Sequence, residues 1–333
     1  MKIALHKIGN KVLNEGAGFS DTELQINDET KELLQNYFLG SFKSEETFQF
    51  YSDSYLSQNI IFTVISQIFE HSADFIQQSQ NIGRHLYDAG QNPRIQGGEL
   101  FVVYFKAENE NEVDKIGIFK TEKREPFLKI SPNEIDPIEV DKGVSLLKID
   151  KAALIFNQDK ETGYVLQVVD NNKNGDMYYW FEDFLKVKQR ADEYFHTQET
   201  LTVYKDFITK QLPAEYEVTK ADQADLLNKG LGFFKEKESF DYDEFTSEVL
   251  QGDENMIESF GNYMSDYEQE LQISIPSDFP ISNAAVKKQN RGFKTIIKLD
   301  KNFSIYVHGD RNLIDQGKDE SGKYYKLYFE EEK

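Results

Sequence analysis

A run of cationic side chains near the end of the sequence carries its clearest chemistry. Residues 286–301 hold six Lys or Arg residues and one acidic residue, Asp300. Ammonium and guanidinium groups bind phosphate oxygens, and phosphate neutralisation dominates the affinity of proteins for duplex DNA. The alternative is a solvated strand edge whose lysines prevent pairing with other strands. The first interpretation predicts DNA contacts from Lys287, Lys288, Arg291, Lys294 and Lys298.

The most acidic stretch of the sequence has the opposite chemistry. Residues 236–258 hold nine Asp or Glu residues and a single Lys. Such a surface repels DNA, keeps the protein in solution and can attract a basic protein. Carboxylates at this density can also bind Mg²⁺, although acids are common at helix starts because they stabilise the helix dipole. We predict an acidic partner face formed by Glu238, Asp241, Asp243 and Glu244.

Two further basic runs are weaker candidates for phosphate contacts. Residues 115–129 contain five basic and two acidic residues. Lys186, Lys188 and Arg190 are spaced by two on an expected helix, so they would fan around it and form no stripe. This last pattern is typical of an ordinary solvated helix.

Motifs for enzymatic chemistry are absent from the sequence. It contains no G-x-x-x-x-G-K-[ST] loop, no G-x-G-x-x-G that opens a helix and no G-x-S-x-G elbow. The five histidines are scattered, without the spacing of an H-E-x-x-H zinc site. Because the chain has no cysteine, disulfides and thiolate metal sites are excluded. We therefore expect no catalytic residue, no metal and no cofactor.

Hydrophobic periodicity predicts the elements that position these residues in the first half of the chain. An apolar stripe at helical spacing predicts one helix over 57–78, and a first strand is expected at 2–9. Further strands are expected after it, and their short connections favour an antiparallel meander whose one face is covered by N-terminal helices. These strands should lie at 100–105, 116–121, 127–130, 144–149, 152–157 and 164–169.

The second half of the chain is expected to be helical and to end in strands. Thr219 and Asp222 form an N-cap pair, and Gly230-x-Gly232 indicates a flexible turn inside the helix that follows. The fold class is therefore α+β, an antiparallel sheet with N-terminal helices, followed by a helical region and a small terminal β-sheet. The expected domains are 1–192 and 193–333, with helices near 181–192, 197–211, 219–236, 242–250 and 254–270 and strands near 293–299, 303–308 and 324–329.

Composition limits the class of protein. The 333 residues carry a formal net charge of -21, so DNA binding requires locally gathered basic residues. Aromatic residues make up 14% of the chain, enough large rings to build a core from few apolar positions. No stretch has the length of a membrane span, and the N-terminal apolar run is short for a secretion signal. We expect a soluble cytoplasmic protein.

Five segments share an apolar pattern that spans nearly the whole chain: Lys2–His6, Gly98–Phe105, Leu146–Leu154, Tyr178–Leu185 and Asn290–Phe293. Together they resemble the bacterial nucleoid-associated protein family of the NdpA/YejK type. The resemblance implies a nucleoid-located, DNA-associated protein without established catalytic residues. The sequence departs from the best-known members after the aromatic segment, where they carry more basic residues and this chain has Glu182 and Asp183 before Lys186.

Three hypotheses about function follow. The first is a non-enzymatic nucleoid-associated protein that binds duplex DNA weakly and without sequence specificity. The second is an acidic module that docks a basic DNA-processing protein, and the third is an unrecognised Mg²⁺-dependent nuclease. A homodimer is compatible with each of them, and none involves a membrane.

Overall fold

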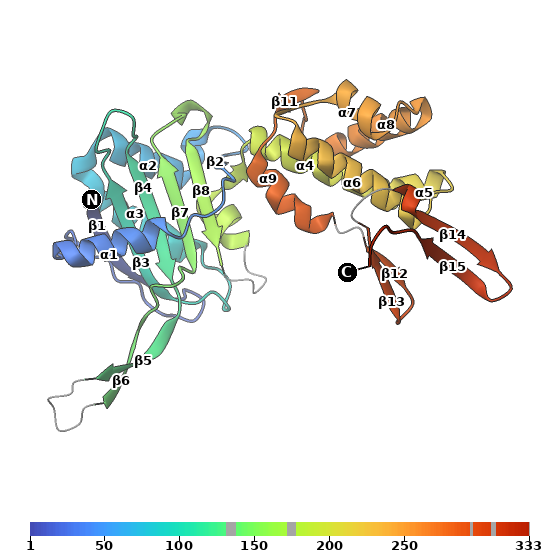
Figure 1. Cartoon of the computed structure of the whole chain (residues 1–333). Helices are drawn as coiled ribbons and strands as arrows, with labels where there is room; N and C mark the ends of the chain where they lie inside the picture. The colour runs from blue at the N-terminus through green and yellow to red at the C-terminus, as the bar shows by residue number, and fades with distance from the viewer. Residues whose placement is uncertain (131–137, 172–177, 294–295, 308–310, 333) are drawn as a thin grey trace. The chain divides into compact units, whose positions relative to one another are not determined.

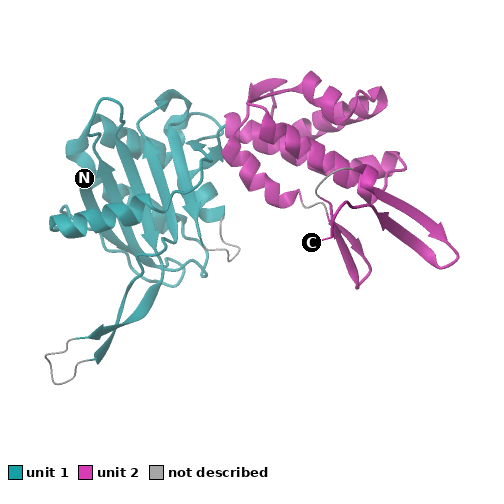
Figure 2. Ribbon diagram, in the orientation of Figure 1, with its two compact units in different colours: residues 1–190 teal, residues 191–333 magenta. Residues whose placement is uncertain are grey.

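The computed structural model describes residues 1–130, 138–171, 178–293, 296–307 and 311–332. The chain divides into two compact units, Met1–Arg190 and Ala191–Lys333 (Figure 2). Each unit is described by itself below. Helices and antiparallel sheets both contribute, so the α+β class is confirmed.

A seven-stranded sheet forms the centre of unit 1 (Figure 1). Its strand order is β1-β3-β4-β7-β8-β2-β9, and every neighbouring pair is antiparallel. The neighbours β3, β4, β7 and β8 follow one another as the expected meander, with a hairpin inserted between β4 and β7. The strands are β1 Lys2–Ile8, β2 Phe48–Phe50, β3 Gly98–Phe105, β4 Lys115–Thr121, β7 Lys151–Phe156, β8 Val165–Asp170 and β9 Val187–Gln189.

Helices cover both faces of this sheet, whereas the sequence predicted a cover over one face. On one face Ile65 and Ile82 join a core cluster that includes Ile118 of β4. On the other face Phe38 stacks on Phe119, with ring centroids 4.3 Å apart. Successive residues of β4 therefore enter two different apolar layers, because side chains alternate along a strand. The helices are α1 Asp28–Leu39 on the second face, and α2 Ile60–Glu70 and α3 Phe75–Ala89 on the first.

The helix predicted over 57–78 is two helices. Its backbone leaves the helical conformation at His71, which has φ -135° and ψ 78°, and a 3₁₀ turn at Ser72–Asp74 precedes α3. The apolar stripe hid this break because Phe69 and Ile76, on either side of it, pack against the same core cluster.

Between β4 and β7 the chain leaves the sheet as a two-stranded hairpin (Figure 1). β5 Arg124–Ile130 pairs antiparallel with β6 Ile138–Val144. The strand predicted at 144–149 is wrong, because only Val144 lies in a strand and the rest forms turns. Leu147 is 96% exposed, whereas Ile149 is buried in the cluster of Phe38 and Phe119, so only part of this run reaches the core.

The helix predicted over 181–192 is also wrong. A π-helix, η4 Tyr179–Leu185, ends at Lys186, whose φ of 51° is left-handed. The chain then adds β9 to the edge of the sheet beside β2. Trp180 and Phe184 are fully buried against the first core cluster, so packing of the rings stops the helix and turns the chain.

Aromatic rings hold the helices of unit 2 together. Tyr204, Phe234 and Phe260 are fully buried in one cluster, with Tyr204 edge-on to Phe260. The predicted cap is confirmed, since Thr219 and Asp222 form a capping box at the start of α6. The helices are α4 Glu193–Asp206, continued by the π-helix η5 Phe207–Gln211 and by α5 Leu212–Glu215, then α6 Lys220–Glu236, α7 Tyr242–Val249, α8 Glu254–Leu271 and α9 Asn283–Gln289.

The terminal strands of unit 2 form two separate hairpins rather than one sheet. Ile297 and Ile314, one from each hairpin, pack with Ala221 and Ala224 in the first turns of α6. An additional pair of short antiparallel strands, β10 and β11, belongs to the helical part of the unit. The strands are β10 Ser239–Asp241, β11 Asp278–Pro280, β12 Ile296–Leu299, β13 Phe303–Tyr306, β14 Ile314–Asp319 and β15 Gly322–Leu327.

Candidate nucleic-acid interface

Helix α9 presents the basic run that the sequence singles out. Ser282 caps the helix by accepting a hydrogen bond from the backbone N of Ala285 at 3.3 Å. Val286 is buried, whereas Lys287 and Lys288 in the last turn are exposed. Cations at this end of a helix are stabilised by its dipole, so the local sequence favours both the helix and the position of its lysines.

Two lysines from other helices complete a group of cations at the end of α9. Nζ of Lys235, on α6, lies 3.4 Å from Oδ1 of Asn290. The side chain of Lys205, on α4, lies beside Gly292, where a Cβ would be 3.7 Å from its Nζ. Asn290 and Gly292 flank Arg291 in the 3₁₀ turn η6 Asn290–Gly292 that follows α9. We name this group the α9 basic cluster: Lys205, Lys235, Lys287, Lys288 and Arg291.

Most of these cations have no acidic partner within the described ranges. No ion pair joins a described carboxylate to Lys205, Lys235, Lys287 or Arg291. Lys288 is anchored differently, with its Nζ 5.4 Å from the centroid of the Tyr194 ring and 3.4 Å from Oε1 of Gln198. The cluster thus concentrates positive charge that the described part of the protein leaves largely uncompensated.

Lys298 lies apart from this cluster, on β12. Its side chain is exposed on the outer face of the hairpin, and Ile297 points inward to the start of α6. Lys235 lies near the other end of α6, about 17 Å along the helix from Ala224. The predicted DNA contacts therefore fall into at least two places, and Lys294 lies outside the described residues.

The second basic run, residues 115–129, does not form a basic surface. Lys120, near the end of the interior strand β4, is fully buried and pairs with Glu122. Arg124 pairs with Glu99, and Lys129 lies 3.8 Å from Glu139. Its charges are therefore largely neutralised within unit 1.

The third basic group is placed by the edge strand β9 and not by a helix. Lys186 caps η4, and Lys188 is exposed on β9. Arg190 donates to Oδ2 of Asp159 at 2.8 Å and to the carbonyl of Tyr164 at 3.4 Å. The group stabilises the chain locally and offers two exposed cations, Lys186 and Lys188.

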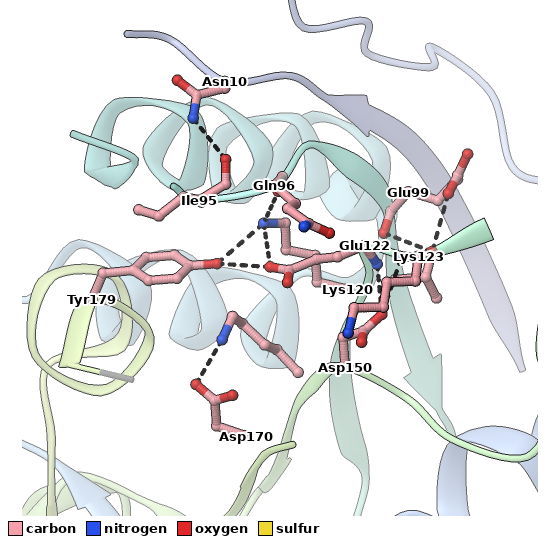
Figure 3. A network of polar contacts seen from close by, with 12 residues as sticks. Asn10, Ile95, Gln96, Glu99, Lys120, Glu122, Lys123, Asp150, Asp170 and Tyr179 are labelled. Atoms are coloured by element: carbon pink, nitrogen blue, oxygen red, sulfur yellow. Dashed lines mark hydrogen bonds and ion pairs between the residues drawn. The ribbon is translucent and has the colours of Figure 1, made fainter. Parts of the chain in front are cut away.

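Unit 1 contains a buried network of charged and hydroxyl groups (Figure 3). Nζ of Lys120 lies 2.7 Å from Oε1 of Glu122, 2.7 Å from the carbonyl of Gln96 and 3.1 Å from the hydroxyl of Tyr179. Lys151 pairs with Asp170 at 2.6 Å, and each of these two side chains is 3% exposed. Tyr179 belongs to η4, and Lys120, Lys151 and Asp170 belong to strands of the sheet, so the network ties η4 to the sheet.

Burial sets the protonation of this network. It lowers the pKa of Lys120, while Glu122 acts in the opposite direction. Burial, with the adjacent Glu122 carboxylate, raises the pKa of Tyr179 well above its usual range. The phenol therefore stays protonated and donates to Glu122 at 3.2 Å. A network that is both inaccessible and internally bonded is structural and does not bind phosphate.

The predicted acidic partner face is exposed, but part of it is already in use. Asp241 caps α7 by accepting from the backbone N of Glu244 at 2.9 Å. Lys237 neutralises Glu244 at 2.6 Å and Glu248 at 3.0 Å. Only Glu238 and Asp243 in the predicted set lack such a role among the described contacts.

The described residues contain no group of three or more His, Asp or Glu side chains arranged to hold a metal ion. The described helices are likewise too short or too polar to cross a bilayer.

Comparison with known proteins supplies the family. No curated protein matches the chain significantly. The family model described as nucleoid-associated protein YejK matches residues 4–321, nearly the whole sequence. This family is bacterial and is not a known enzyme family, and it supports a nucleoid-associated role. The chain therefore belongs to the nucleoid-associated protein YejK family.

Proposed function

We propose that this protein binds duplex DNA weakly and without sequence specificity, through the α9 basic cluster. The observation that carries the proposal is the convergence of cations from α4, α6, α9 and η6 at one place, where no described carboxylate forms an ion pair with four of them. Such cations can release counterions from DNA on binding. The cluster consists of Lys and Arg side chains, which bind phosphate oxygens without reading sequence, so affinity should depend on phosphates alone.

The charge of the whole chain explains why binding should be weak. Its net charge of -21 repels a polyanion at long range, and salt screens that repulsion more effectively than it screens close contacts. With about five phosphate contacts, the logarithm of the binding constant should fall with the logarithm of salt at a slope of about -4 to -5. The bacterial nucleoid, and hence the cytoplasm, is the corresponding location.

A salt titration with matched variants tests the proposal. Fluorescence anisotropy of a labelled random-sequence duplex would be measured with the wild type and with Lys287→Gln/Arg291→Gln. Each lost phosphate contact should reduce the slope by about 1, uniformly across duplex sequences. The control is Lys318→Gln/Lys323→Gln, which removes the same charge from exposed positions on β14 and β15.

Two results would contradict the proposal. One is the absence of binding by the wild type even at low ionic strength. The other is an equal loss of binding in both double variants, because a general effect of net charge would then account for it. Lys298→Gln further asks whether β12 contributes a separate contact.

A further inference from the structure

Unit 2 contains a second surface feature, a hollow beside helix α8. It encloses about 580 Å³ and lies between one face of α8 and the chain from η5 through α5. The wall from α8 carries Glu258, Asn262, Asp266 and Glu270, which are spaced by four and so lie along one stripe of the helix. The hollow is long enough to follow several turns of α8.

Tyrosine rings form the other part of this hollow. Tyr263 and Tyr267 lie one turn apart on α8, and Tyr216 faces them from the end of α5. Tyr263 packs against Phe207, and the hydroxyl of Tyr267 donates to Oε2 of Glu199 at 2.6 Å. These contacts fix the rings in place, so they form a firm aromatic wall rather than a mobile one.

Lys210, the cation next to the lining residue Gln211, pairs with Asp206 and forms no ion pair with a carboxylate of the hollow. Glu215 is engaged by Gln211 and Ser259. The other three carboxylates, Glu258, Asp266 and Glu270, are exposed and form no ion pair with any described residue. None of the described lining residues is Lys or Arg. The hollow is therefore a negative site whose charge the described part of the chain leaves uncompensated.

The protonation of the tyrosines is consistent with this negative field. Burial raises the pKa of Tyr263, and the nearby Asp206 and Glu270 carboxylates act in the same direction. Burial and Glu199 together raise the pKa of Tyr267 above its usual range. Both rings therefore stay neutral and present a face to which a cation is attracted.

We propose that this hollow, the α8 groove, binds a peptide segment of a partner protein that carries several Arg or Lys side chains. Rings next to carboxylates accept a guanidinium well, because it can stack on the ring while it donates to the acid. DNA is excluded by charge. The stripe of acids spaced by four along α8 matches an extended cationic peptide better than one small cation. The proposal sharpens the second hypothesis from the sequence, since three acids of the region predicted there, Asp241, Glu244 and Glu248, are already engaged by the cap of α7 or by Lys237.

Binding of a defined peptide tests the proposal on the full chain. The probe is a fluorescein-labelled peptide of alternating Arg and Gly, measured by anisotropy, with a citrulline-for-arginine peptide as the uncharged match. The test variant is Glu258→Gln/Asp266→Asn/Glu270→Gln, which keeps side-chain size and disturbs no described hydrogen bond. The control is Glu32→Gln/Glu45→Gln/Asp53→Asn, which removes the same charge from exposed positions of unit 1.

The expected result is a loss of about tenfold in affinity in the groove variant and little change in the control. The citrulline peptide should not bind, and Tyr263→Phe should retain binding because the ring remains. Equal losses in the two triple variants would overturn the proposal, as would no binding by the wild type at low salt. Displacement of the peptide by spermine at a lower concentration would assign the groove to a polyamine instead.

The test is independent of the DNA proposal. The groove variant should keep DNA binding, and Lys287→Gln/Arg291→Gln should keep peptide binding. Either function can therefore fail while the other survives.

Discussion

The two densest basic runs of the sequence, one in each unit, differ in their burial and in their ion pairs. In unit 1, Lys120 is buried and bonded to Glu122, and its neighbours pair with acids. In unit 2, Lys287 and Arg291 are exposed and are joined by lysines from two other helices. Two runs that are both basic in the sequence thus form a buried structural network in one case and a candidate phosphate-binding surface in the other. The difference shows that the role of a cation depends on whether the fold buries it beside an acid or leaves it exposed.

The largest expected effect separates these roles through stability. Lys120→Met should cost about 3–5 kcal/mol, because it removes the cation from beside the buried Glu122 carboxylate. Urea denaturation with equilibrium unfolding would measure the change. Lys123→Met, at an exposed position in the same run, should change the free energy of unfolding by less than about 0.5 kcal/mol. Similar losses in both variants would place the network at the surface.

Two glycines of α6, in unit 2, likewise differ in what surrounds them. The sequence predicted a flexible turn at Gly230-x-Gly232, and this is wrong, because α6 runs through both. A Cβ at Gly230 would lie 2.2 Å from a ring carbon of Tyr204, whereas nothing lies within 4 Å of a Cβ at Gly232.

The two alanine substitutions should therefore differ in sign. Gly230→Ala should destabilise by about 1–3 kcal/mol through overpacking against a fully buried ring. Gly232→Ala should stabilise by about 0.5–1 kcal/mol, since alanine favours a helix interior. Thermal unfolding of the two variants measures both, and destabilisation by Gly232→Ala would show that space is not what distinguishes them.

A fall in pH should destabilise unit 1 by less than the substitution of Lys120, and one buried histidine should account for much of the loss. His6 is buried, its Nδ1 accepts from the backbone N of Ser20 at 3.1 Å, and burial followed by Arg84 lowers its pKa to about 4. The unfolded state, with a pKa of about 6.5, binds the proton first. The stabilising contribution is thus complete above pH 6.5 and is lost as the pH falls toward 4.

About 1–2 kcal/mol of stability should disappear between pH 8 and pH 5 because of this group. His6→Gln should flatten that part of the profile of unfolding free energy against pH, although it lowers stability throughout. An unchanged slope in the variant would assign the acid sensitivity to other groups, among them His85, whose pKa burial also lowers.

The smallest expected effect concerns the surface that is proposed to bind DNA. Lys287→Gln/Arg291→Gln should change the free energy of unfolding by less than about 0.5 kcal/mol, because both side chains are exposed. Its DNA affinity should nevertheless fall about tenfold in low salt. A large loss of stability in this variant would mean that the α9 basic cluster is structural, like the Lys120 network.

Some elements could be predicted from the sequence and others could not. The meander and the cap at Thr219 were predictable, because alternation and capping are local rules. The break at His71 and the π-helix at Tyr179–Leu185 were not, because ring packing against distant strands overrides the local period.

The candidate surface was predictable only in part. Lys287, Lys288 and Arg291 lie within five residues of one another in the sequence, and the structure places the two lysines exposed on α9 and Arg291 exposed on η6. Lys205 and Lys235 could not be found in the same way, since they reach the cluster from α4 and α6 across long stretches of chain.

The sequence by itself determined the α+β class, the antiparallel pairing and the concentration of cations in residues 286–301. Each of these depends on residue types that are close together along the chain. Only the tertiary structure decided which cations are neutralised and which acids remain open. Whether Lys120 meets Glu122, or Lys237 meets Glu244, depends on strands and helices that folding brings together, and burial sets the strength of those charges.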